Sequence, residues 1–323
     1  MRALVLTAGL GTRLRPLTYV RAKAAVPVNG EPLARRVLRR LAHEGFHDAV
    51  LNLHHHPESI ASVVGDGSDL DVHVRYSWEN PVLGSAGGPR HALPLLTNGT
   101  APARGTFLIV NGDTLTELKV SDVVAAHRRS GALVTMAVIP NPRPEKYGGV
   151  LLAGLSGADA AVTGFSGPRP GIVSHHFVGI QVAESAAFEC LPDGVPAESV
   201  GGLYPKLIAE HPGSVRAFVC DAPFQDIGTA ADYLETSLAL ARQEGDALVS
   251  PHASIDAGAT LERTAVWDDV SVEAGAHLVE CVVCDEVRIP SGTRLTRKAI
   301  VNAAGRTPQN GETIEGGLLI RDF

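Results

Sequence analysis

The sequence holds few cysteines and few aromatic residues. Four of its 323 residues are cysteine, and aromatic residues make up 5%. The cysteines are scattered, so they do not provide the framework of a small disulfide-rich secreted domain, and we expect a reducing compartment, the cytoplasm. We expect both tryptophans, Trp78 and Trp267, to be packing anchors. The four cysteines are Cys190, Cys220, Cys281 and Cys284.

The chain also lacks long apolar runs and an excess of positive charge. No run reaches the roughly 20 residues that a membrane helix needs. No basic segment followed by an apolar core opens the chain, so we expect neither a signal peptide nor a membrane partner. The formal net charge is −7, whereas a general nucleic-acid binder is expected to be basic. We therefore expect no nucleic-acid partner.

What is present is an ordinary globular composition, with 45% apolar and 20% charged residues. The length suits one large domain and a smaller one. Up to about residue 245, strand-like apolar runs alternate with helical patterns. This alternation predicts an α/β domain over residues 1–245, with a Rossmann-like, mostly parallel sheet and helices on both faces. The expected strands are 3–7, 49–53, 72–76, 107–110, 132–139, 162–165 and 176–182, and the expected helices are 32–44, 57–64, 86–96, 120–130, 200–210 and 230–242.

Residues 246–323 follow a different pattern, a repeat of 17 residues. Four sets of positions recur with this period over three repeats, which is strong evidence for stacked units. Apolar residues five or six positions apart predict the short faces of a parallel β-helix, with glycine at the corner. An end coil would leave an unpaired edge, so we expect a homo-oligomer formed through this domain. The sets are Ile255, Val272 and Ile289; Leu261, Leu278 and Leu295; Gly258, Gly275 and Gly292; and Val266, Val283 and Ile300.

The most informative segment is a glycine turn close to the N-terminus. A short apolar strand runs into Gly9 and Gly11, and the basic residues Arg13 and Lys23 follow. Glycines let backbone N–H groups approach a phosphate closely, and basic side chains can neutralise it. The segment has neither the third glycine of the Rossmann fingerprint nor the Gly-Lys-Ser/Thr of a P-loop. It predicts a nucleoside triphosphate site, although the glycine spacing by itself also fits an ordinary strand–turn–helix connection.

A second turn is expected at the same edge of the sheet. Asn111, Gly112 and Asp113 directly follow the strand predicted over 107–110. In open α/β sheets ligands bind at the carboxyl ends of the strands. The two turns should therefore line one rim.

In these motifs the chain resembles the sugar-1-phosphate nucleotidylyltransferases, or NDP-sugar pyrophosphorylases, and among them the mannose-1-phosphate guanylyltransferase-like members. The similarity covers nearly the whole chain, and five ordered motifs are highly specific. Some members end in a left-handed parallel β-helix, as the repeat here suggests. The matching segments are Gly9–Thr18 with Lys23 and Pro27-Val28, Leu83–Gly88, Asn111–Asp113, Tyr147-Gly148, and Asp226–Thr229 with Asp232-Tyr233.

The resemblance implies a Mg²⁺-dependent transfer of a nucleotidyl group to a sugar-1-phosphate, and it assigns roles to residues of this chain. The implied catalytic residues are Arg13, Lys23 and Asp113. The implied nucleotide-binding residues are Ala8, Gly9, Gly11, Thr12, Arg13, Gly84, Ala86, Gly87 and Asp113. Tyr147, Gly148, Arg169 and Gly179 are implied to bind the sugar phosphate, and Asp113 and Asp226 to hold the metal.

Two departures from the family pattern fall in the half of the site that binds the sugar. The family's Phe-x-Glu-Lys-Pro is replaced by the segment from Phe165 to Pro170, in which Arg169 could take over the phosphate contact of the missing lysine. The family's Asn-Ala-Gly is replaced by Phe177, Val178 and Gly179. These changes affect the identity of the sugar more than the nucleotide chemistry.

Three readings of the function follow. The first is an enzyme that uses GTP with mannose-1-phosphate or a related sugar, with UTP or dTTP as alternatives. The second is a non-catalytic regulatory subunit that binds a sugar nucleotide. The loss of the Glu-Lys pair favours this reading, and the presence of Arg13, Lys23, Asp113 and Asp226 argues against it. The third, an acyltransferase built on the repeat, ranks last, because three coils are short for that activity.

Overall fold

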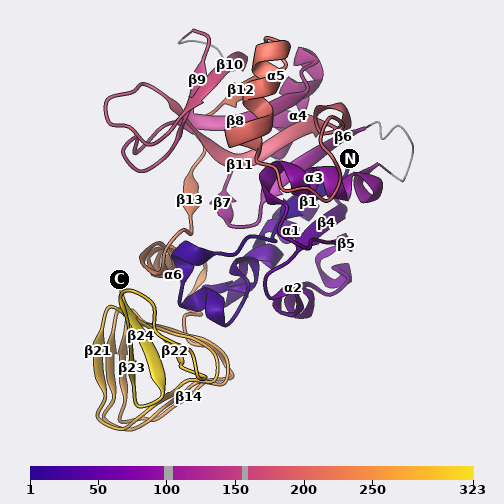
Figure 1. Cartoon of the computed structure of the whole chain (residues 1–323). Coiled ribbons are helices and arrows are strands. Elements are labelled where there is room, and N and C mark those ends of the chain that lie inside the picture. The colour runs from indigo at the N-terminus through magenta and orange to yellow at the C-terminus, as the bar shows by residue number, and fades with distance from the viewer. Residues whose placement is uncertain (98–104, 155–158) are drawn as a thin grey trace. The chain divides into compact units, whose positions relative to one another are not determined.

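The computed structural model describes residues 1–97, 105–154 and 159–323 (Figure 1). None of the helices in this part of the chain is long and apolar enough to cross a membrane. The helices are α1 (Leu33–His43), α2 (Pro57–Val64), α3 (Gly84–Leu96), α4 (Val120–Ser130), α5 (Tyr204–Glu210) and α6 (Ala230–Glu244). The strands up to α6 are β1 (Ala3–Leu6), β2 (Pro27–Val28), β3 (Glu31–Pro32), β4 (Asp48–Leu53), β5 (His73–Trp78), β6 (Thr106–Asn111), β7 (Thr114–Thr116), β8 (Val134–Pro140), β9 (Gly149–Leu152), β10 (Asp159–Ser166), β11 (His175–Glu184), β12 (Val215–Val219) and β13 (Phe224–Asp226).

The described chain divides into two compact units. Unit 1 comprises Met1–Gly9, Val37–Pro57 and Val64–Gln225, and unit 2 comprises Leu10–Arg36, Glu58–Val63 and Asp226–Phe323. The division does not follow a single cut at residue 245. Two N-terminal segments, which include the turn from Gly11 to Lys23, belong to the unit that also contains the C-terminal repeats.

A nine-stranded sheet forms the centre of unit 1, in the order β5-β4-β1-β6-β11-β8-β12-β10-β9. The strands β5, β4, β1 and β6 run parallel, as predicted. The rest of the sheet is mixed, which corrects the prediction of a mostly parallel sheet: β12 runs parallel to β8, but β11 runs antiparallel to β6 and β8, and β10 antiparallel to β12 and β9. No helix lies between β8 and β11 in the described chain, so these strands lack the crossovers that parallel neighbours need.

Helices cover both faces of this sheet, as the alternation of strands and helices predicts. Val134 and Met136 of β8 belong to a core cluster that contains residues of α3 and α5. Thr135 lies between them and points to the other face. There its hydroxyl is 2.9 Å from Nδ1 of the buried His127 of α4. The α3 and α5 helices therefore pack on one face and α4 on the other.

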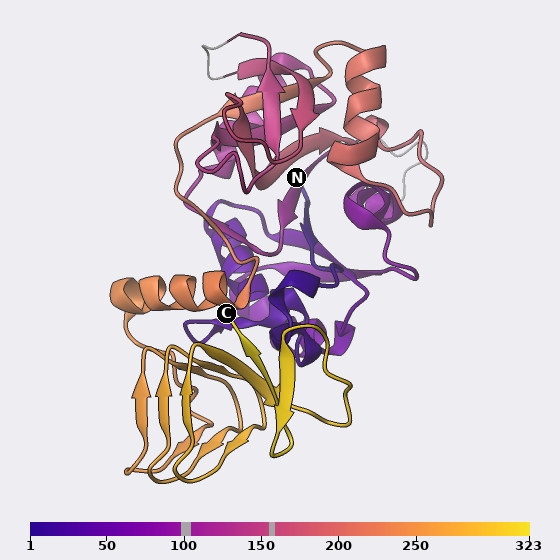
Figure 2. The same cartoon turned by 60° about the vertical axis from the view of Figure 1, so that its left-hand side comes forward.

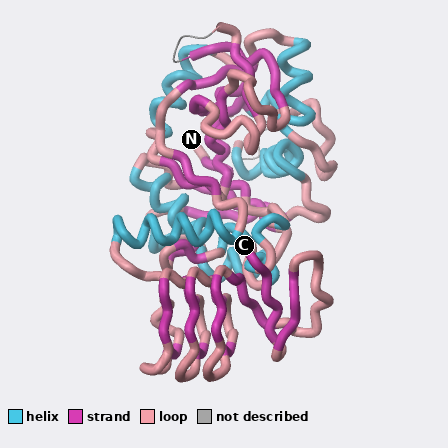
Figure 3. The backbone as a smooth tube through the Cα atoms, turned by 90° about the vertical axis from the view of Figure 1, so that its left-hand side faces the viewer, coloured by secondary structure: helices cyan, strands magenta, loops and turns pink. Residues whose placement is uncertain are grey.

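The C-terminal part of unit 2 is a stack of short parallel strands (Figures 2 and 3). Three ladders run through it, and the register in each advances by 17 residues, as in Leu261↔Leu278↔Leu295. The predicted period is thereby confirmed. Two strands, β23 and β24, add antiparallel to one ladder. The ladders are formed by β14 (Ser254–Ile255), β17 (Ser271–Val272) and β20 (Arg288–Ile289); β15 (Thr260–Glu262), β18 (His277–Val279) and β21 (Arg294–Thr296); and β16 (Ala265–Val266), β19 (Val282–Val283), β22 (Lys298–Asn302), β24 (Leu318–Asp322) and β23 (Glu312–Glu315).

Glycine makes only some of the corners in this stack. Gly275 and Gly292 have positive φ angles of 73° and 70°. Another corner is formed by Arg263, Glu280 and Arg297, which adopt the left-handed conformation with φ angles of 48°, 51° and 55°. Glu280 lies between the two arginines and accepts a hydrogen bond from each. Ion pairing along the stack accompanies a backbone conformation that non-glycine residues rarely adopt.

The two tryptophans differ in their environment. Trp267 is 2% exposed and packs in unit 2, as predicted. Trp78 is 63% exposed, so the prediction that it anchors packing is wrong. It is the last residue of β5, where the strand reaches the carboxyl edge of the sheet and side chains leave the core.

Candidate active site

Four parallel strands of unit 1 end at one edge of the sheet, where open α/β sheets bind ligands. Leu6, the last residue of β1, lies opposite Asn111, the last residue of β6. The turns that follow these two strands are therefore neighbours. One contains Ala8 and Gly9 and the other contains Asp113, so the structure brings three of the predicted site residues together.

Gly112 makes this close approach possible. Its N–H donates to the carbonyl oxygen of Leu6 at 3.0 Å. A Cβ atom at this position would lie 2.8 Å from that oxygen and 2.9 Å from Cγ2 of Thr7. Only glycine fits here. Asp113 follows it directly, half-buried, with the Thr114 hydroxyl 3.4 Å from its Oδ1.

Gly179 of β11 approaches the same turn. Its φ angle is 78°, and a Cβ atom would lie 2.9 Å from Oγ1 of Thr114 and 3.0 Å from Cβ of Asn111. The pairing of β11 with β8 shifts register at this point. The predicted sugar-side residue Gly179 thus lies against the turn that carries Asp113.

The predicted residues Gly84, Ala86 and Gly87 form the first turn of α3. Gly84 has a φ angle of 76°, and the N–H groups of Ala86 and Gly87 donate to the carbonyl oxygen of Ala197. A Cβ atom on Gly87 would lie 2.7 Å from the carbonyl oxygen of Val195. The glycines at this helix start therefore let the segment around Ala197 pack closely on α3.

Two buried polar residues that the sequence analysis missed connect these elements. Asn52 at the end of β4 accepts hydrogen bonds from the N–H groups of Thr7 and Ala8. Its side-chain amide donates to Glu79, which also accepts from the N–H of Leu83. The available signal was a polar residue, Asn52, inside the otherwise apolar run from Ala49 to Leu53.

Other predicted sugar-side residues belong to an aromatic cluster in unit 1. The ring of Tyr147 lies 4.4 Å from that of His176 and 6.1 Å from that of Phe224. Arg143 donates to the Tyr147 hydroxyl at 3.1 Å. Burial lowers the pKa of His176 to about 4, although a hydrogen bond with the Gly148 backbone opposes the shift. The imidazole is therefore neutral at pH 7, and the cluster offers ring faces and hydrogen-bonding groups.

Arg169 lies in the exposed loop after β10. Its N–H donates to the carbonyl oxygen of Pro144 at 2.7 Å. This bond ties the loop to the segment that precedes Tyr147. The structure thus brings Arg169 next to the segment that leads to Tyr147 and Gly148, while its side chain remains exposed.

The remaining predicted residues are in unit 2, where Gly11 organises the basic turn. Its φ angle is 59°, and a Cβ atom would lie 2.7 Å from Cγ2 of Thr18 and 3.3 Å from Cβ of Lys23. The Thr18 hydroxyl donates to the Gly11 carbonyl oxygen at 3.0 Å. Thr12 and Arg13 begin the short 3₁₀ turn that follows. Lys23 is therefore packed beside the glycine turn.

Arg13 and Asp226 come together around Gly228. A Cβ atom on Gly228 would lie 3.1 Å from Nη1 of Arg13 and 3.3 Å from Oδ2 of both Asp226 and Asp232. Asp232 also closes a capping box with Thr229 at the start of α6. A guanidinium group and carboxylates thus gather at one helix start.

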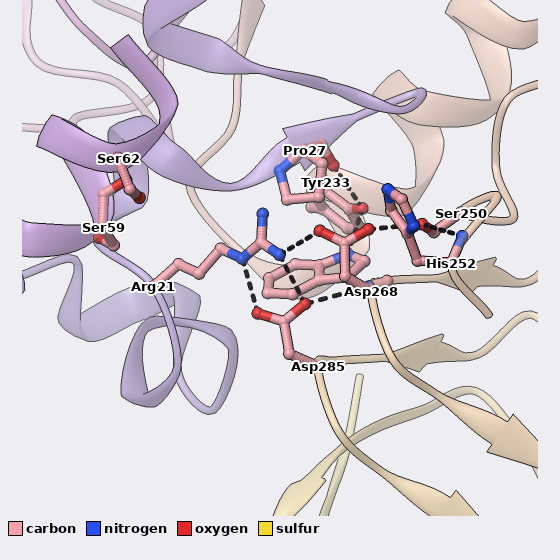
Figure 4. Close-up of polar contacts among 10 residues, drawn as sticks. Arg21, Pro27, Ser59, Ser62, Tyr233, Ser250, His252, Asp268 and Asp285 are labelled. Carbon is pink, nitrogen blue, oxygen red and sulfur yellow. Dashed lines mark hydrogen bonds and ion pairs between the residues drawn. The ribbon is translucent and has the colours of Figure 1, made fainter. Parts of the chain in front are cut away.

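A second polar cluster in unit 2 fixes the segment that carries Lys23 (Figure 4). Arg21 donates to Asp268 at 2.6 Å and to both carboxylate oxygens of Asp285, and it lies over the ring of Trp267.

A second set of contacts in this cluster reaches Pro27. Trp267 Nε1 donates to the Tyr233 hydroxyl, which donates to the carbonyl oxygen of Pro27. The chain is therefore held on both sides of Lys23. Sequence reasoning missed this cluster because its members come from distant segments.

The metal ligands were predicted as Asp113 and Asp226. In the described parts of the chain, no group of three or more histidine, cysteine, aspartate or glutamate residues is arranged to hold a metal ion. Asp113 is in unit 1 and Asp226 in unit 2, and both are half-buried. Mg²⁺ commonly takes one or two carboxylates and completes its shell with water and substrate phosphates. The oxygen donors of these two residues suit Mg²⁺, and the ion itself stays a prediction.

Comparison with known proteins identifies the family. The family model described as nucleotidyl transferase matches residues 2–167. The mannose-1-phosphate guanylyltransferase of Mycobacterium tuberculosis is 28% identical over 269 residues, which cover 80% of this chain and 72% of the relative. The N-acetylmuramate alpha-1-phosphate uridylyltransferase of Neisseria meningitidis is 35% identical over 217 residues, which cover 65% of this chain and 85% of the relative.

Solved structures share the fold. The UDP-glucose pyrophosphorylase from Acinetobacter baumanii superimposes with a TM-score of 0.63 at 19% identity, covering 75% of this chain and 94% of that chain. HddC from Yersinia pseudotuberculosis, solved with GMP-PN, gives a TM-score of 0.60 at 21% identity, covering 74% of this chain and 99% of that chain. At these identities the likeness concerns the fold alone.

Proposed function

The chain belongs to the nucleotidyl transferase family, and we propose that it joins a nucleoside triphosphate to a sugar-1-phosphate, giving an NDP-sugar and pyrophosphate. The observation that carries this proposal is the pairing of two turns at one sheet edge. The glycine turn after β1 and the Gly112–Asp113 turn after β6 are neighbours because Leu6 lies opposite Asn111. The relatives from Mycobacterium tuberculosis and Neisseria meningitidis are named for reactions of this class.

The reaction needs charge neutralisation and alignment rather than a general base. A phosphate oxygen of the sugar-1-phosphate forms a bond to the α-phosphorus, and the bond from that phosphorus to the bridging oxygen of the leaving pyrophosphate breaks. The attacking oxygen is already ionised at pH 7, so no proton must be removed. Both reactants are anions, and their repulsion is countered by cationic groups. Arg13 would clamp the leaving pyrophosphate, and Lys23, held beside Gly11, would bind a phosphate at the reaction centre.

Backbone and sugar-side groups complete the proposed site. The turn with Ala8, Gly9, Gly11 and Thr12 would cradle the phosphates, and the start of α3 at Gly84, Ala86 and Gly87 would lie near the base. Tyr147, Gly148, Arg169 and Gly179 would bind the sugar phosphate. The aromatic cluster of Tyr147, His176 and Phe224 supports a sugar site, because aromatic faces and neutral hydrogen-bonding groups suit a sugar ring.

Mg²⁺ is the proposed cofactor, held by Asp113 and Asp226. When bound, it would neutralise phosphate oxygens and help to orient them. The Arg13 guanidinium and the Asp226 carboxylate both lie beside Gly228, 3.1 and 3.3 Å from where its Cβ atom would be. This proximity supports a shared role in binding triphosphate.

The proposed substrates are GTP and mannose-1-phosphate, in line with the relative from Mycobacterium tuberculosis, which is named a mannose-1-phosphate guanylyltransferase. A second candidate is UTP with an N-acetylated sugar-1-phosphate, because the relative at 35% identity is named a uridylyltransferase. The changed segments at Phe165–Pro170 and Phe177–Gly179 fall on the sugar side, so the sugar is the less constrained half of this proposal.

The C-terminal stack is proposed to be a left-handed β-helix through which the protein forms a homo-oligomer. The end strands of its ladders, such as β14 and β21, have one strand neighbour each in the described chain, and such edges favour pairing with a second copy. Light scattering of the purified protein tests the oligomer, and a monomer at all concentrations contradicts it.

The proposed location is the cytoplasm. None of the four cysteines, all within described segments, is in a disulfide, which supports a reducing compartment.

The function is tested by measuring pyrophosphate release from GTP, UTP, dTTP and ATP, each combined with a panel of sugar-1-phosphates, with Mg²⁺ and with chelator. Mg²⁺-dependent turnover of one nucleotide–sugar pair is the expected result. If no pair turns over while a nucleotide sugar binds tightly, the protein is a regulatory subunit rather than an enzyme.

A further inference from the structure

Asn52 and Glu79 are polar residues buried where β4 and β5 end. Their exposed fractions are 3% and 5%. Burying an amide or a carboxyl group is costly unless its hydrogen bonds are satisfied. The side chains of Asn52 and Glu79 are hydrogen-bonded to each other and to the backbone N–H groups of the segments that follow β1 and precede α3.

Asn52 fixes the turn that follows β1. Its Oδ1 accepts from the N–H of Thr7 at 2.6 Å and from the N–H of Ala8 at 3.3 Å. The Thr7 hydroxyl donates to the carbonyl oxygen of Asn52. These bonds attach the first residues of the glycine turn to the end of β4.

Glu79 continues the chain of hydrogen bonds to the start of α3. Its Oε1 accepts from Asn52 Nδ2 at 2.7 Å, and its Oε2 accepts from the N–H of Leu83 at 2.7 Å. Its own N–H donates to the carbonyl oxygen of Leu53. Leu83 directly precedes the first turn of α3, so Glu79 fixes where that helix begins.

Gly88 of α3 closes over the pair. A Cβ atom at this position would lie 2.6 Å from Glu79 Oε1 and 3.0 Å from Asn52 Nδ2. The second turn of α3 therefore packs directly on the hydrogen bond between the two side chains. This packing shields the hydrogen bond from water, so leaving either of its groups unpaired would be costly.

We propose that Asn52 and Glu79 are positioning residues that set the spacing between the glycine turn after β1 and the start of α3, and thereby the affinity for the nucleoside triphosphate. This inference rests on the proposed function, in which the glycine turn receives the phosphates and the start of α3 lies near the base. A nucleotide that contacts both the glycine turn and the start of α3 binds tightly only when these two segments are at the right separation. The pair acts through Thr7, Ala8 and Leu83, whose backbone it holds.

Each hydrogen bond of the pair needs a donor on one side and an acceptor on the other. Exchanging the amide and the carboxylate between positions 52 and 79 therefore tests the proposal. In Asn52→Asp, two carboxylates face each other. In Glu79→Gln, the new amide can satisfy either Asn52 or Leu83 but not both, because it offers one acceptor where two were present. In the double variant N52D/E79Q, the introduced carboxylate can accept from Thr7, Ala8 and the introduced amide, while the oxygen of that amide accepts from Leu83. The double exchange restores every bond and leaves the net charge unchanged.

The measurement is the equilibrium dissociation constant of GTP, UTP, dTTP and ATP by titration calorimetry, together with the KM of both substrates wherever there is turnover. We expect each single variant to weaken binding of the preferred nucleotide about tenfold or more, the scale of one mismatched buried hydrogen bond. The KM of the sugar-1-phosphate should change less than about threefold. The double variant should return to within about threefold of the wild type in nucleotide affinity.

A matched control removes a buried hydrogen bond elsewhere in unit 1. The Tyr204 hydroxyl donates to Gln181 at 2.8 Å, and both residues are buried. Tyr204→Phe should lower the melting temperature and leave nucleotide affinity unchanged. If the Asn52 and Glu79 variants lose thermal stability in the same way, with nucleotide affinity unchanged, their role is merely structural and the proposal is overturned.

Failure of the inference can be told from failure of the proposed function. If the wild type binds nucleotide but no sugar-1-phosphate reacts, the enzymatic function fails while the binding comparison still decides the inference. If the wild type turns over substrates and the single variants keep its nucleotide affinity, the inference fails and the function stands. If the wild type binds none of the four nucleotides, both fail.

Discussion

Arg21 binds Asp285 through two nitrogens. Its Nε lies 2.6 Å from Oδ2 of Asp285 and its Nη2 lies 2.7 Å from Oδ1. Both side chains are largely shielded, with exposed fractions of 15% and 16%. This fork joins the segment two residues before Lys23 to the repeat region of the same unit.

Arg21→Met should destabilise the protein. The substitution leaves Asp285 and Asp268 facing each other without the cation, and an uncompensated buried charge of this kind costs about 3 kcal/mol. Urea denaturation of the variant measures the loss. Arg263→Met breaks an exposed pair with Glu280 instead, and should cost less than about 0.5 kcal/mol. Equal losses in the two variants would contradict a special role for the fork.

Lys23→Met should reduce kcat/KM by about 100-fold or more, the usual scale for removing one group that stabilises a developing charge. The side chain keeps its length, so the packing of its Cβ beside Gly11 is retained. Steady-state kinetics with the preferred substrate pair measures the effect. Lys119→Met is the control, since Lys119 is exposed before α4, and comparable losses in both variants would argue against a role for Lys23 in catalysis.

Gly9→Ala and Gly11→Ala should fail in different ways. Among the described residues, leaving out Gly9 and its two chain neighbours, no atom lies within 4 Å of a Cβ on Gly9. A Cβ on Gly11 would meet Cγ2 of Thr18 at 2.7 Å with φ at +59°. Gly9→Ala should therefore keep the melting temperature and raise the KM of the nucleotide about tenfold or more, because the added methyl would occupy the space that the proposed site gives to phosphate. Gly11→Ala should lower the melting temperature as well.

An unchanged nucleotide KM in Gly9→Ala would show that this face of the turn does not receive the phosphates. Calorimetric melting curves and steady-state kinetics on the same samples separate the two effects.

The stability of the protein should fall as the pH drops below 6.5, the ordinary pKa of histidine. Burial lowers the pKa of His176 to about 4 in the folded state. Between these values the unfolded chain binds a proton that the folded protein excludes, so protonation favours unfolding. His176→Phe should flatten this part of the profile, measured as the free energy of unfolding in urea from about pH 7 to about pH 4. His43→Gln, which alters an exposed histidine, should leave the slope as in the wild type, and an unchanged slope in His176→Phe would contradict the assignment.

Removal of divalent cations should abolish turnover, and MgCl₂ should restore it. Asp113→Asn and Asp226→Asn should each lower kcat about 100-fold or more and shift half-saturation to higher Mg²⁺, since each removes a charged oxygen ligand. Asp122→Asn is the control, because Asp122 lies in the exposed first turn of α4. Full activity of both site variants at low Mg²⁺ would show that the ion is held elsewhere.

Much of the fold follows from local pattern. The parallel strands β1, β4, β5 and β6, the helices between them and the period of the C-terminal ladders are readable because each buries a regular apolar set. The antiparallel pairing of β10 and β11 with their neighbours was not predicted, because strand direction depends on the connections between strands and not on residue type. The exposure of Trp78 likewise depends on where β5 ends, and the residue type alone does not show where a strand ends.

By itself the sequence determined the glycine turns, the basic residues that follow them and the 17-residue repeat, since each of these is written in neighbouring or regularly spaced residues. Only the tertiary structure decided how these parts are held. Asn52 meets Glu79 across 27 residues and Arg21 meets Asp285 across 264. Hydrogen-bonded partners at such separations leave no periodic trace in the chain, because their contact depends on the path of the backbone between them and on the burial that makes their pairing necessary.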